Sequence, residues 1–147
     1  MRILLINGPN LNTLGQREPQ VYGSATLQEI EARVAERAAA LGAEVKAFQS
    51  NHEGAMVDFI QGEAAGAEGM IINPGALTHY GLSLRDAIAA SGLPAIEVHI
   101  SNIYGREWFR RRSVTADVCR GLVAGLGWRG YVVALEALVE MLKESPA

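Results

Sequence analysis

The chain has 147 residues, of which 49% are hydrophobic and 20% are charged. A chain of this length can bury a stable core, and its composition is that of a globular protein rather than a disordered one. We therefore expect a single domain spanning residues 1–147. The net charge of −3 argues against a general surface for nucleic acids or other polyanions.

Positive charge is concentrated in one part of the chain. Residues 97–129 hold six arginines and three acidic residues, whereas the rest of the chain is acidic. This local surplus indicates a site for a small, negatively charged ligand. The two lysines, Lys46 and Lys143, fall within a predicted strand and near the C-terminus, so neither is placed for Schiff-base chemistry.

Cys119 is the only cysteine, which excludes an intramolecular disulfide and a cysteine-rich zinc site. Because it lies at an apolar run, we expect a buried, unreactive thiol. The apolar run at 3–6 is too short for a signal sequence, and no stretch approaches the roughly 20 apolar residues of a membrane span. We therefore expect a soluble protein of the cytoplasm.

Short apolar runs alternate along the chain with longer segments of helical periodicity. The predicted elements are, in chain order, a strand at 3–6, a helix at 26–41, a strand at 44–49, a helix at 50–65, a strand at 69–73, a helix at 82–90, strands at 95–100 and 119–124, and a helix at 130–143. Capping boxes formed by Thr26 with Glu29 and by Ser50 with Glu53 predict where the first two helices begin.

Strands that alternate with helices of about ten or more residues indicate a parallel sheet with helices on both faces. Five such units fit the flavodoxin-like, doubly wound α/β fold, in which the strand order is 2-1-3-4-5. Ligands of such sheets bind beyond the carboxyl ends of the strands, near the reversal in strand order. The residues just after the first, third and fourth strands are therefore the candidate site.

Polar side chains gather at these three strand ends. Asn10 follows the first strand, Asn73 and His79 follow the third, and Glu97 and His99 share one face of the fourth. Taken singly, each has an ordinary structural explanation, and the Glu97–His99 pair is as readily a buried hydrogen bond as a catalytic dyad. Their occurrence together at three distant strand ends favours a functional site.

These residue types suit proton transfer next to a carbonyl group. Tyr22 acts as a base only as the phenolate, which the guanidinium of Arg17 could stabilise. His99, held by Glu97, could give a proton to a leaving hydroxyl. The remaining candidates would bind a carboxylate or hydroxyl groups: the backbone N–H groups of Ile100 and Ser101, and the guanidinium of Arg110.

Other functions find less support in the sequence. Residues 125–130 match a dinucleotide-binding pattern literally, but too little chain follows for the strand and acidic residue such a site needs, so we expect a tight turn. No spacing of His, Cys, Asp and Glu is typical of a metal site. The alternative to an enzyme is a binding module for a small carboxylate, or for RNA through the arginines at 110–112.

The motifs along the whole chain resemble those of one enzyme family. They include Asn-Gly-Pro-Asn-Leu at 7–11, Arg-Glu-Pro at 17–19, Tyr-Gly at 22–23, Asn-Pro-Gly-Ala-Leu-Thr-His at 73–79, Leu-Arg-Asp-Ala at 84–87, Glu-Val-His-Ile-Ser-Asn at 97–102 and Phe-Arg at 109–110. With these motifs the chain resembles the type II 3-dehydroquinate dehydratases, or type II dehydroquinases, from end to end.

The resemblance implies dehydration of 3-dehydroquinate to 3-dehydroshikimate, in shikimate biosynthesis or quinate breakdown, without a cofactor or a metal. The reaction would be an anti elimination through an enolate. Tyr22 would take the C2 proton, with Arg17 stabilising its phenolate. His99, oriented by Glu97, would protonate the departing C1 hydroxyl, and Asn10 would position a water that stabilises the enolate.

The resemblance also implies binding roles and an assembly. The roles fall on Asn73 beside the acid, Ile100 and Ser101 at the substrate carboxylate, His79 and Arg110 at ring hydroxyls, Arg106 in support of the site, and Asp86 at the site of a neighbouring subunit. Residues 14–24 would form a mobile lid. Trimers would pack into a homododecamer.

One segment departs from the resemblance. After His79 the chain reads Tyr-Gly-Leu-Ser at 80–83, where the family more often has Thr-Ser-Val-Ala. Glycine offers no capping hydroxyl and costs entropy to order. Gly81 therefore predicts a looser start of the following helix.

Overall fold

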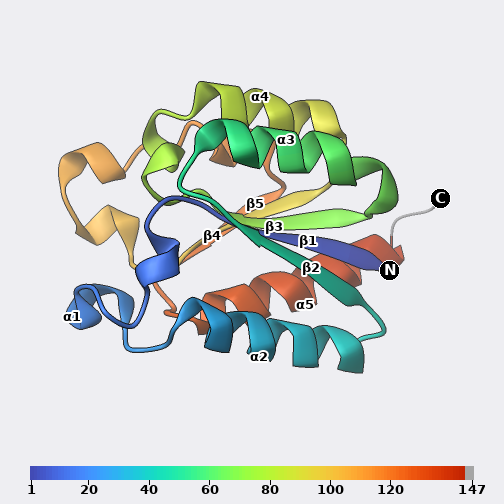
Figure 1. Ribbon diagram of the computed structural model, residues 1–147, viewed down its shortest axis with the longest axis horizontal. Helices are drawn as coiled ribbons and strands as arrows, with labels where there is room; N and C mark the ends of the chain where they lie inside the picture. Colours follow the sequence, from blue (N-terminus) through green and yellow to red (C-terminus); the bar gives the residue numbers. More distant parts are fainter. Residues whose placement is uncertain (145–147) are drawn as a thin grey trace.

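The computed structural model describes residues 1–144, which form one parallel sheet with helices on both faces (Figure 1). The strands are β1 (Arg2–Asn7), β2 (Glu44–Gln49), β3 (Gly69–Asn73), β4 (Ala95–His99) and β5 (Gly121–Ala124). All neighbouring strands pair in parallel, in the order β2-β1-β3-β4-β5. The predicted flavodoxin-like fold and its strand order are confirmed.

Two helices cover each face of the sheet. The four longer helices are α2 (Leu27–Ala40), α3 (Glu53–Glu63), α4 (Leu82–Ser91) and α5 (Arg129–Glu144). Ile3 and Leu5 of β1 join the core under α2 and α5, whereas Leu4 and Ile6 join the core under α3 and α4. Side chains of β1 thus alternate between two buried faces, which is why this strand reads as a continuous apolar run.

The predicted strands at the centre of the sheet are buried along their length. Every residue of β3 and β4 is buried, whereas the edge strands β2 and β5 are only partly buried. β5 begins at Gly121, two residues later than predicted. The chain before it forms a 3₁₀ helix at Ala116–Val118, and the Cys119 N–H bonds back to the Ala116 carbonyl at 3.0 Å instead of joining the sheet.

The predicted start of α2 is confirmed. Thr26 precedes the helix, and its hydroxyl accepts a hydrogen bond from the Glu29 N–H at 3.2 Å. Gly42 lies just beyond the helix with φ +78°, as a glycine at this position commonly does. Within residues 1–144, no helix has both the length and the apolar character needed to cross a membrane.

The predicted capping box of Ser50 and Glu53 is wrong. The Ser50 hydroxyl accepts from the N–H of His52 at 3.0 Å, and α3 begins only at Glu53. The Glu53 carboxylate instead accepts a hydrogen bond from the Leu84 N–H, at 3.0 Å, in the first turn of α4. A partner that is 31 residues away has taken the place of a local one, which a local sequence pattern cannot reveal.

Two contacts, one at Gly81 itself and one between Glu53 and Leu84, change the interpretation of Gly81. This residue precedes α4, and a Cβ atom there would lie 2.7 Å from the Leu77 carbonyl oxygen, so the close approach requires glycine. The capping group that Gly81 lacks is supplied by Glu53, because its carboxylate accepts from Leu84. The predicted loosening of this helix start is therefore offset by a side chain from α3.

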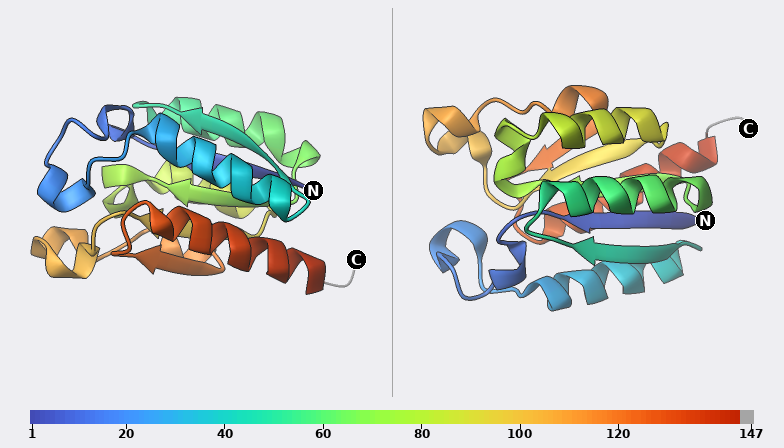
Figure 2. Two further views of the ribbon diagram at one scale, coloured as in Figure 1. Left: turned by 90° about the horizontal axis from the view of Figure 1, so that it is seen from below. Right: turned by 45° about the horizontal axis from the view of Figure 1, so that its top comes forward.

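Two irregular segments project beyond the carboxyl ends of the strands, as both views of Figure 2 show. The first contains the short helix α1 (Pro19–Tyr22) and lies within the predicted lid at 14–24. The second runs from β4 to β5, over residues 100–120.

The chain just after β1 passes very close to the chain just after β3. A Cβ atom at Gly8 would lie 2.4 Å from the Pro74 carbonyl oxygen, so this close approach requires glycine.

Candidate active site

A cavity of about 140 Å³ lies at the carboxyl ends of β1, β3 and β4, and we call it the inner cavity. Its lining includes Asn10 after β1, Asn73 and His79 at and after β3, His99, Ile100 and Ser101 at the end of β4, Arg17 and Tyr22 from the lid segment, and Arg106 and Arg110 from the segment after β4. The predicted site residues other than Glu97 and Asp86 therefore meet in one place.

Tyr22 and Arg17 contribute to the wall of the inner cavity from the lid segment. Arg17 Nη2 donates a hydrogen bond to the Tyr22 hydroxyl over 3.3 Å, and its guanidinium carbon lies 4.4 Å from the centre of the ring. The guanidinium carbon of Arg106 lies 5.2 Å from the same ring centre. Two positive charges are therefore placed to stabilise negative charge on the Tyr22 oxygen.

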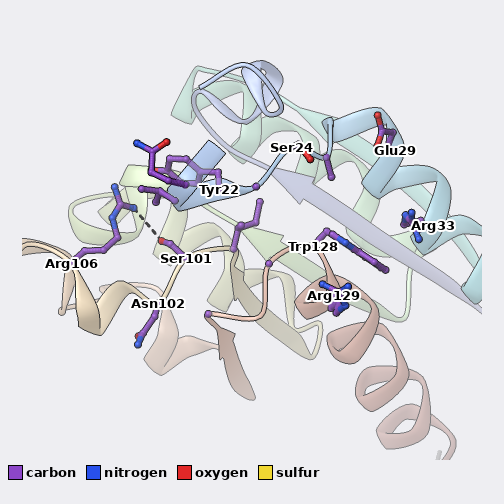
Figure 3. A pocket seen from close by; sticks show the side chains of 16 residues that line it. Tyr22, Ser24, Glu29, Arg33, Ser101, Asn102, Arg106, Trp128 and Arg129 are labelled. Atoms are coloured by element: carbon purple, nitrogen blue, oxygen red, sulfur yellow. Dashed lines mark hydrogen bonds between the residues drawn. The ribbon is translucent and has the colours of Figure 1, made fainter. Parts of the chain in front are cut away.

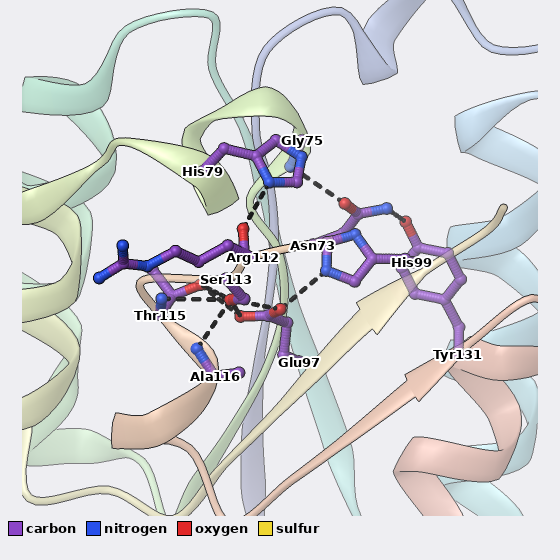
Figure 4. Close-up of polar contacts among 10 residues, drawn as sticks. All are labelled: Asn73, Gly75, His79, Glu97, His99, Arg112, Ser113, Thr115, Ala116 and Tyr131. Carbon is purple, nitrogen blue, oxygen red and sulfur yellow. Dashed lines mark hydrogen bonds and ion pairs between the residues drawn. The ribbon is translucent and has the colours of Figure 1, made fainter. Parts of the chain in front are cut away.

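His99 reaches the same cavity from β4, with Glu97 behind it (Figure 4). Nε2 of His99 lies 2.8 Å from Oε2 of Glu97, and the two residues are 5% and 0% exposed. Because a carboxylate only accepts hydrogen bonds, Nε2 of His99 carries the hydrogen in this pair. The other ring nitrogen, Nδ1, is then the one that can serve a bound molecule.

Two hydroxyl groups hold Glu97 in place, and the sequence had not singled them out. Ser113 Oγ donates to Glu97 Oε2 at 2.9 Å, and Thr115 Oγ1 donates to Oε1 (Figure 4). A fully buried carboxylate needs such partners to keep its charge. Ser113 and Thr115 lie in an irregular segment where no periodic pattern marks them.

Asn73 is fixed by a buried network that includes Tyr131 of α5. Its Nδ2 donates to the Tyr131 hydroxyl at 2.9 Å, and its Oδ1 accepts from the Gly75 N–H at 3.1 Å. The Tyr131 hydroxyl donates in turn to Asn7 Oδ1 at 2.7 Å. Burial raises the pKa of Tyr131 well above its ordinary value, so its hydroxyl stays protonated as a donor.

His79 is oriented by the backbone of the segment that follows β4. It ends the 3₁₀ helix at Gly75–His79, and its Nδ1 donates to the backbone carbonyl of Arg112 at 2.7 Å. A carbonyl oxygen only accepts, so Nδ1 of His79 carries a hydrogen and Nε2 remains for a ligand.

Arg106 is held at the end of β4. Its Nη1 donates a hydrogen bond to the Ser101 hydroxyl at 3.2 Å, which fixes a further guanidinium beside the inner cavity.

Asp86 lies outside the inner cavity, on the exposed side of α4. Its predicted contact is with the site of a neighbouring subunit. A single chain does not test this contact, so the role of Asp86 stays a prediction.

A second cavity, of about 660 Å³, adjoins the first, and we call it the outer cavity (Figure 3). Tyr22 and Arg106 line both cavities, so they form a wall that the two share. The Trp128 ring lines the outer cavity, with its centre 4.2 Å from the guanidinium carbon of Arg33 and 4.9 Å from that of Arg129. The lining of the outer cavity holds three arginines, Arg33, Arg106 and Arg129, against one acidic residue, Glu29, so it is positive as well.

The other sequence features lie away from both cavities or have structural roles. Lys46 pairs with Glu63 at 2.6 Å, and Lys143 donates to the Leu41 carbonyl at 3.3 Å. Residues 125–128 of the glycine-rich segment form the predicted turn between β5 and α5, and Gly125, Gly127 and Trp128 also line the outer cavity. In the part of the chain that the structure describes, no three His, Cys, Asp or Glu side chains come together in a way that could hold a metal ion.

Comparisons with known proteins agree with this arrangement. The chain is 60% identical over 146 residues to the 3-dehydroquinate dehydratase of Roseiflexus castenholzii, with 99% of this chain and 93% of that protein covered. The crystal structure of type II dehydroquinase from Propionibacterium acnes has a TM-score of 0.91 at 43% identity and covers 95% of this chain and 96% of its own. That from Butyrivibrio crossotus has a TM-score of 0.91 at 46% identity and covers 98% of each chain.

The family assignment follows from the sequence over nearly the whole chain. The sequence model of the family described as Dehydroquinase class II matches residues 1–139, which span every strand and most of α5. The resemblance that the motifs indicated is therefore confirmed, and this chain belongs to the class II dehydroquinase family.

Proposed function

We propose that this chain dehydrates 3-dehydroquinate to 3-dehydroshikimate by an anti elimination through an enolate, with Tyr22 as the base and His99 as the acid. Its family and the names of its curated relatives support the activity of a type II 3-dehydroquinate dehydratase. The observation that carries the mechanism is that Tyr22 beside Arg17, and His99 backed by Glu97, line one small cavity.

The first step is removal of the C2 proton by the Tyr22 phenolate, whose charge Arg17 and Arg106 stabilise. The electron pair of the C–H bond moves onto the neighbouring C3 carbonyl oxygen and forms an enolate. In the second step the enolate re-forms the carbonyl and expels the C1 hydroxyl, which leaves as water with a proton from His99. A proton then returns from Tyr22 to His99 through water, and both groups are reset.

The other residues of the inner cavity bind the substrate or its intermediate. Asn10 positions a water against the enolate oxygen, and Asn73, which Tyr131 holds in place, assists His99. The remaining contacts are the N–H groups of Ile100 and Ser101 to the carboxylate, and His79 and Arg110 to ring hydroxyls. The reaction proposed in this way uses no cofactor.

The cellular setting and the assembly are also proposals. The activity would serve shikimate biosynthesis or quinate breakdown in the cytoplasm. Trimers would pack into a dodecamer, with Asp86 on the exposed side of α4 reaching a neighbouring site. Size-exclusion chromatography with light scattering should give the mass of twelve chains. A clean monomer would contradict both the assembly and the role of Asp86.

The decisive experiment follows the ultraviolet absorbance of the product, because a double bond at C1–C2 is conjugated with the ketone. Purified protein should produce this absorbance from 3-dehydroquinate, and His99→Asn should abolish it without loss of the fold. His52→Asn is the matched control, since His52 is exposed and lies away from both cavities. If the wild-type protein forms no enone, the proposed activity is wrong. If His99→Asn turns over normally, His99 is not the acid.

A further inference from the structure

One short segment contacts the supports of both cavity histidines. It consists of residues 112–115, and we call it the strap. The backbone carbonyl of Arg112 accepts the Nδ1–H of His79 at 2.7 Å. Three residues later, Thr115 donates to Glu97, which accepts the Nε2–H of His99 at 2.8 Å (Figure 4). The strap therefore meets one histidine directly and the other through a single carboxylate.

The strap fixes Glu97 through two donors. The Ser113 hydroxyl accepts from the N–H groups of Thr115 at 3.2 Å and Ala116 at 2.9 Å. These two donors occupy the lone-pair side of the oxygen, so the hydroxyl hydrogen is directed to Glu97 Oε2, at 2.9 Å. Thr115 donates to the other carboxylate oxygen. With both oxygens held, the carboxylate cannot rotate away from His99.

The strap is itself anchored to the segment that carries His79 and to α4. Its third residue, Val114, donates its N–H to the carbonyl of Thr78, immediately before His79, at 2.7 Å. The Val114 carbonyl accepts from Nη1 of Arg85 at 2.8 Å, and the same guanidinium pairs with Asp117. Arg85 lies outside the lining of the inner cavity, so any effect it has on the histidines passes through the strap.

We propose that residues 112–115, anchored by Arg85, are a positioning element that holds His79 and His99 in opposite tautomers. In His79 the hydrogen is kept on Nδ1 by the Arg112 carbonyl, and in His99 it is kept on Nε2 by Glu97. Nε2 of His79 and Nδ1 of His99 are then the nitrogens that face the substrate. For His99 to act as the acid, Nδ1 must carry a second proton, so the consequence for catalysis rests on the proposed function.

The ring tautomers can be read directly, because the chain has three histidines. In protein labelled with ¹⁵N at histidine only, solid-state NMR at a pH where the rings are neutral should show His79 as the Nδ1–H form and His99 as the Nε2–H form. The exposed His52 serves as the internal reference. In Arg85→Met, we expect both cavity rings to become mixtures while the His52 signal stays unchanged.

Steady-state kinetics of matched variants separates a loss of histidine positioning from a general loss of folded structure. Arg85→Met should lower kcat about tenfold and raise KM, because it releases His79 as well as Glu97. Asp117→Asn removes the ion pair but keeps the bond from Arg85 to Val114, so its kcat should stay within about twofold of wild type. Thermal unfolding establishes that each variant is folded.

The Glu97 side of the strap is tested by Ser113→Ala combined with Thr115→Val. This double variant should lose about 10- to 100-fold in kcat with little change in KM, because only the acid is disturbed. The single variant Thr115→Ser keeps a hydroxyl at this position, so it should keep the activity that Thr115→Val loses. If the double variant does not fold, the single Thr115→Val variant and Arg85→Met carry the test.

The outcomes distinguish this proposal from the proposed function. If folded Arg85→Met and Thr115→Val keep wild-type kcat and tautomers while His99→Asn is inactive, the strap has no positioning role and the catalytic assignment survives. If His99→Asn stays active, the catalytic assignment fails, and the NMR spectra alone decide whether the strap fixes the rings.

Discussion

Arg17 and Tyr22 form a pair within one short segment, in which the guanidinium both donates to the phenol oxygen over 3.3 Å and lies 4.4 Å from the ring centre. Only four residues separate them, and the last turn of that segment is the four-residue helix α1. Local chain geometry thus brings the two side chains together, while the Tyr22 ring also packs against the core under α2 and α5. Its consequences can be tested one residue at a time.

Tyr22→Phe should lose turnover and keep binding. The substitution deletes only the oxygen that is proposed to accept the proton, and the ring keeps its contacts with Arg17 and Arg106. We expect kcat to fall by about 10²- to 10⁴-fold, the usual contribution of a general base. Enone formation reports turnover, and calorimetry with 3-dehydroquinate reports binding. Tyr104→Phe, at an exposed tyrosine, is the control, and near-normal turnover in Tyr22→Phe would show that another group is the base.

Arg17→Ala should also reduce kcat, because the Tyr22 oxygen loses its hydrogen-bond donor and its nearest positive charge. We expect a smaller loss than for Tyr22→Phe, since Arg106 still lies 5.2 Å from the ring centre. The matched control is Arg33→Ala, which removes a guanidinium that stacks on Trp128 in the outer cavity. Equal kcat values for the two variants would argue against a special role for Arg17.

Tyr131→Phe should affect both stability and catalysis. It removes the hydroxyl that donates to Asn7 and accepts from Asn73, and it leaves two buried amides short of a partner. Such a loss costs about 1–3 kcal/mol of unfolding free energy, measurable by urea denaturation. Because Asn73 also loses its fixed orientation, kcat should fall. Tyr80→Phe, at a tyrosine that is 64% exposed, should change neither quantity.

Two glycine substitutions should act in opposite directions. Gly81→Ala places a methyl group 2.7 Å from the Leu77 carbonyl and should destabilise the protein by about 1–3 kcal/mol. Gly62→Ala in α3 meets no atom within 4 Å and should stabilise it by about 0.5–1 kcal/mol. Thermal or urea unfolding of both variants checks the pair. A stabilised Gly81→Ala would mean that the chain can relax around Leu77.

The Cys119 thiol should resist modification in the folded protein. Cys119 is partly rather than fully buried, and this burial, with the nearby charges of Glu97 and Asp117, raises the pKa of its thiol from 9.0 to about 12. At pH 8 the native thiolate fraction is then on the order of one in ten thousand, so a disulfide reagent should react fully only after unfolding. Rapid labelling of the native protein would contradict the shift.

The same shift links stability to pH. Because the pKa of Cys119 is raised on folding, its contribution to stability is fully present below about pH 9 and is lost as the pH rises towards 12. Cys119→Ser should show a smaller decline over this range in urea titrations, because that side chain carries no thiol to ionise.

The sheet and most of the cavity could be predicted because their signals are local. The apolar run of β1 and the polar residues Asn73 and His99 lie at positions that strand periodicity alone defines. Features that depend on contacts between distant segments could not be predicted. Glu53 looks like a local cap and instead caps α4, and Tyr131, which no sequence pattern singles out, is buried in the core and holds Asn73.

The segments outside regular structure were the hardest to predict. Ser113 and Thr115 have no partner near them in the sequence that would mark a function, and their importance comes from Glu97, which the sheet places beside them. The short helix α1 was expected only as part of a lid. Pro19 favours its first position, but four residues are too few to show helical periodicity.

The proposed base lies on one short segment and the proposed acid on the sheet, so the two halves of the proposed reaction are carried by separate parts of the fold. Residues 14–24 carry Tyr22 and Arg17, whereas Glu97 and His99 are built into β4. The segment could be exchanged as a cassette from a relative, or rebuilt with a different base, while the acid kept its own supports. If the proposed roles hold, the step that removes the proton can be changed by altering one segment without redesigning the step that removes the hydroxyl.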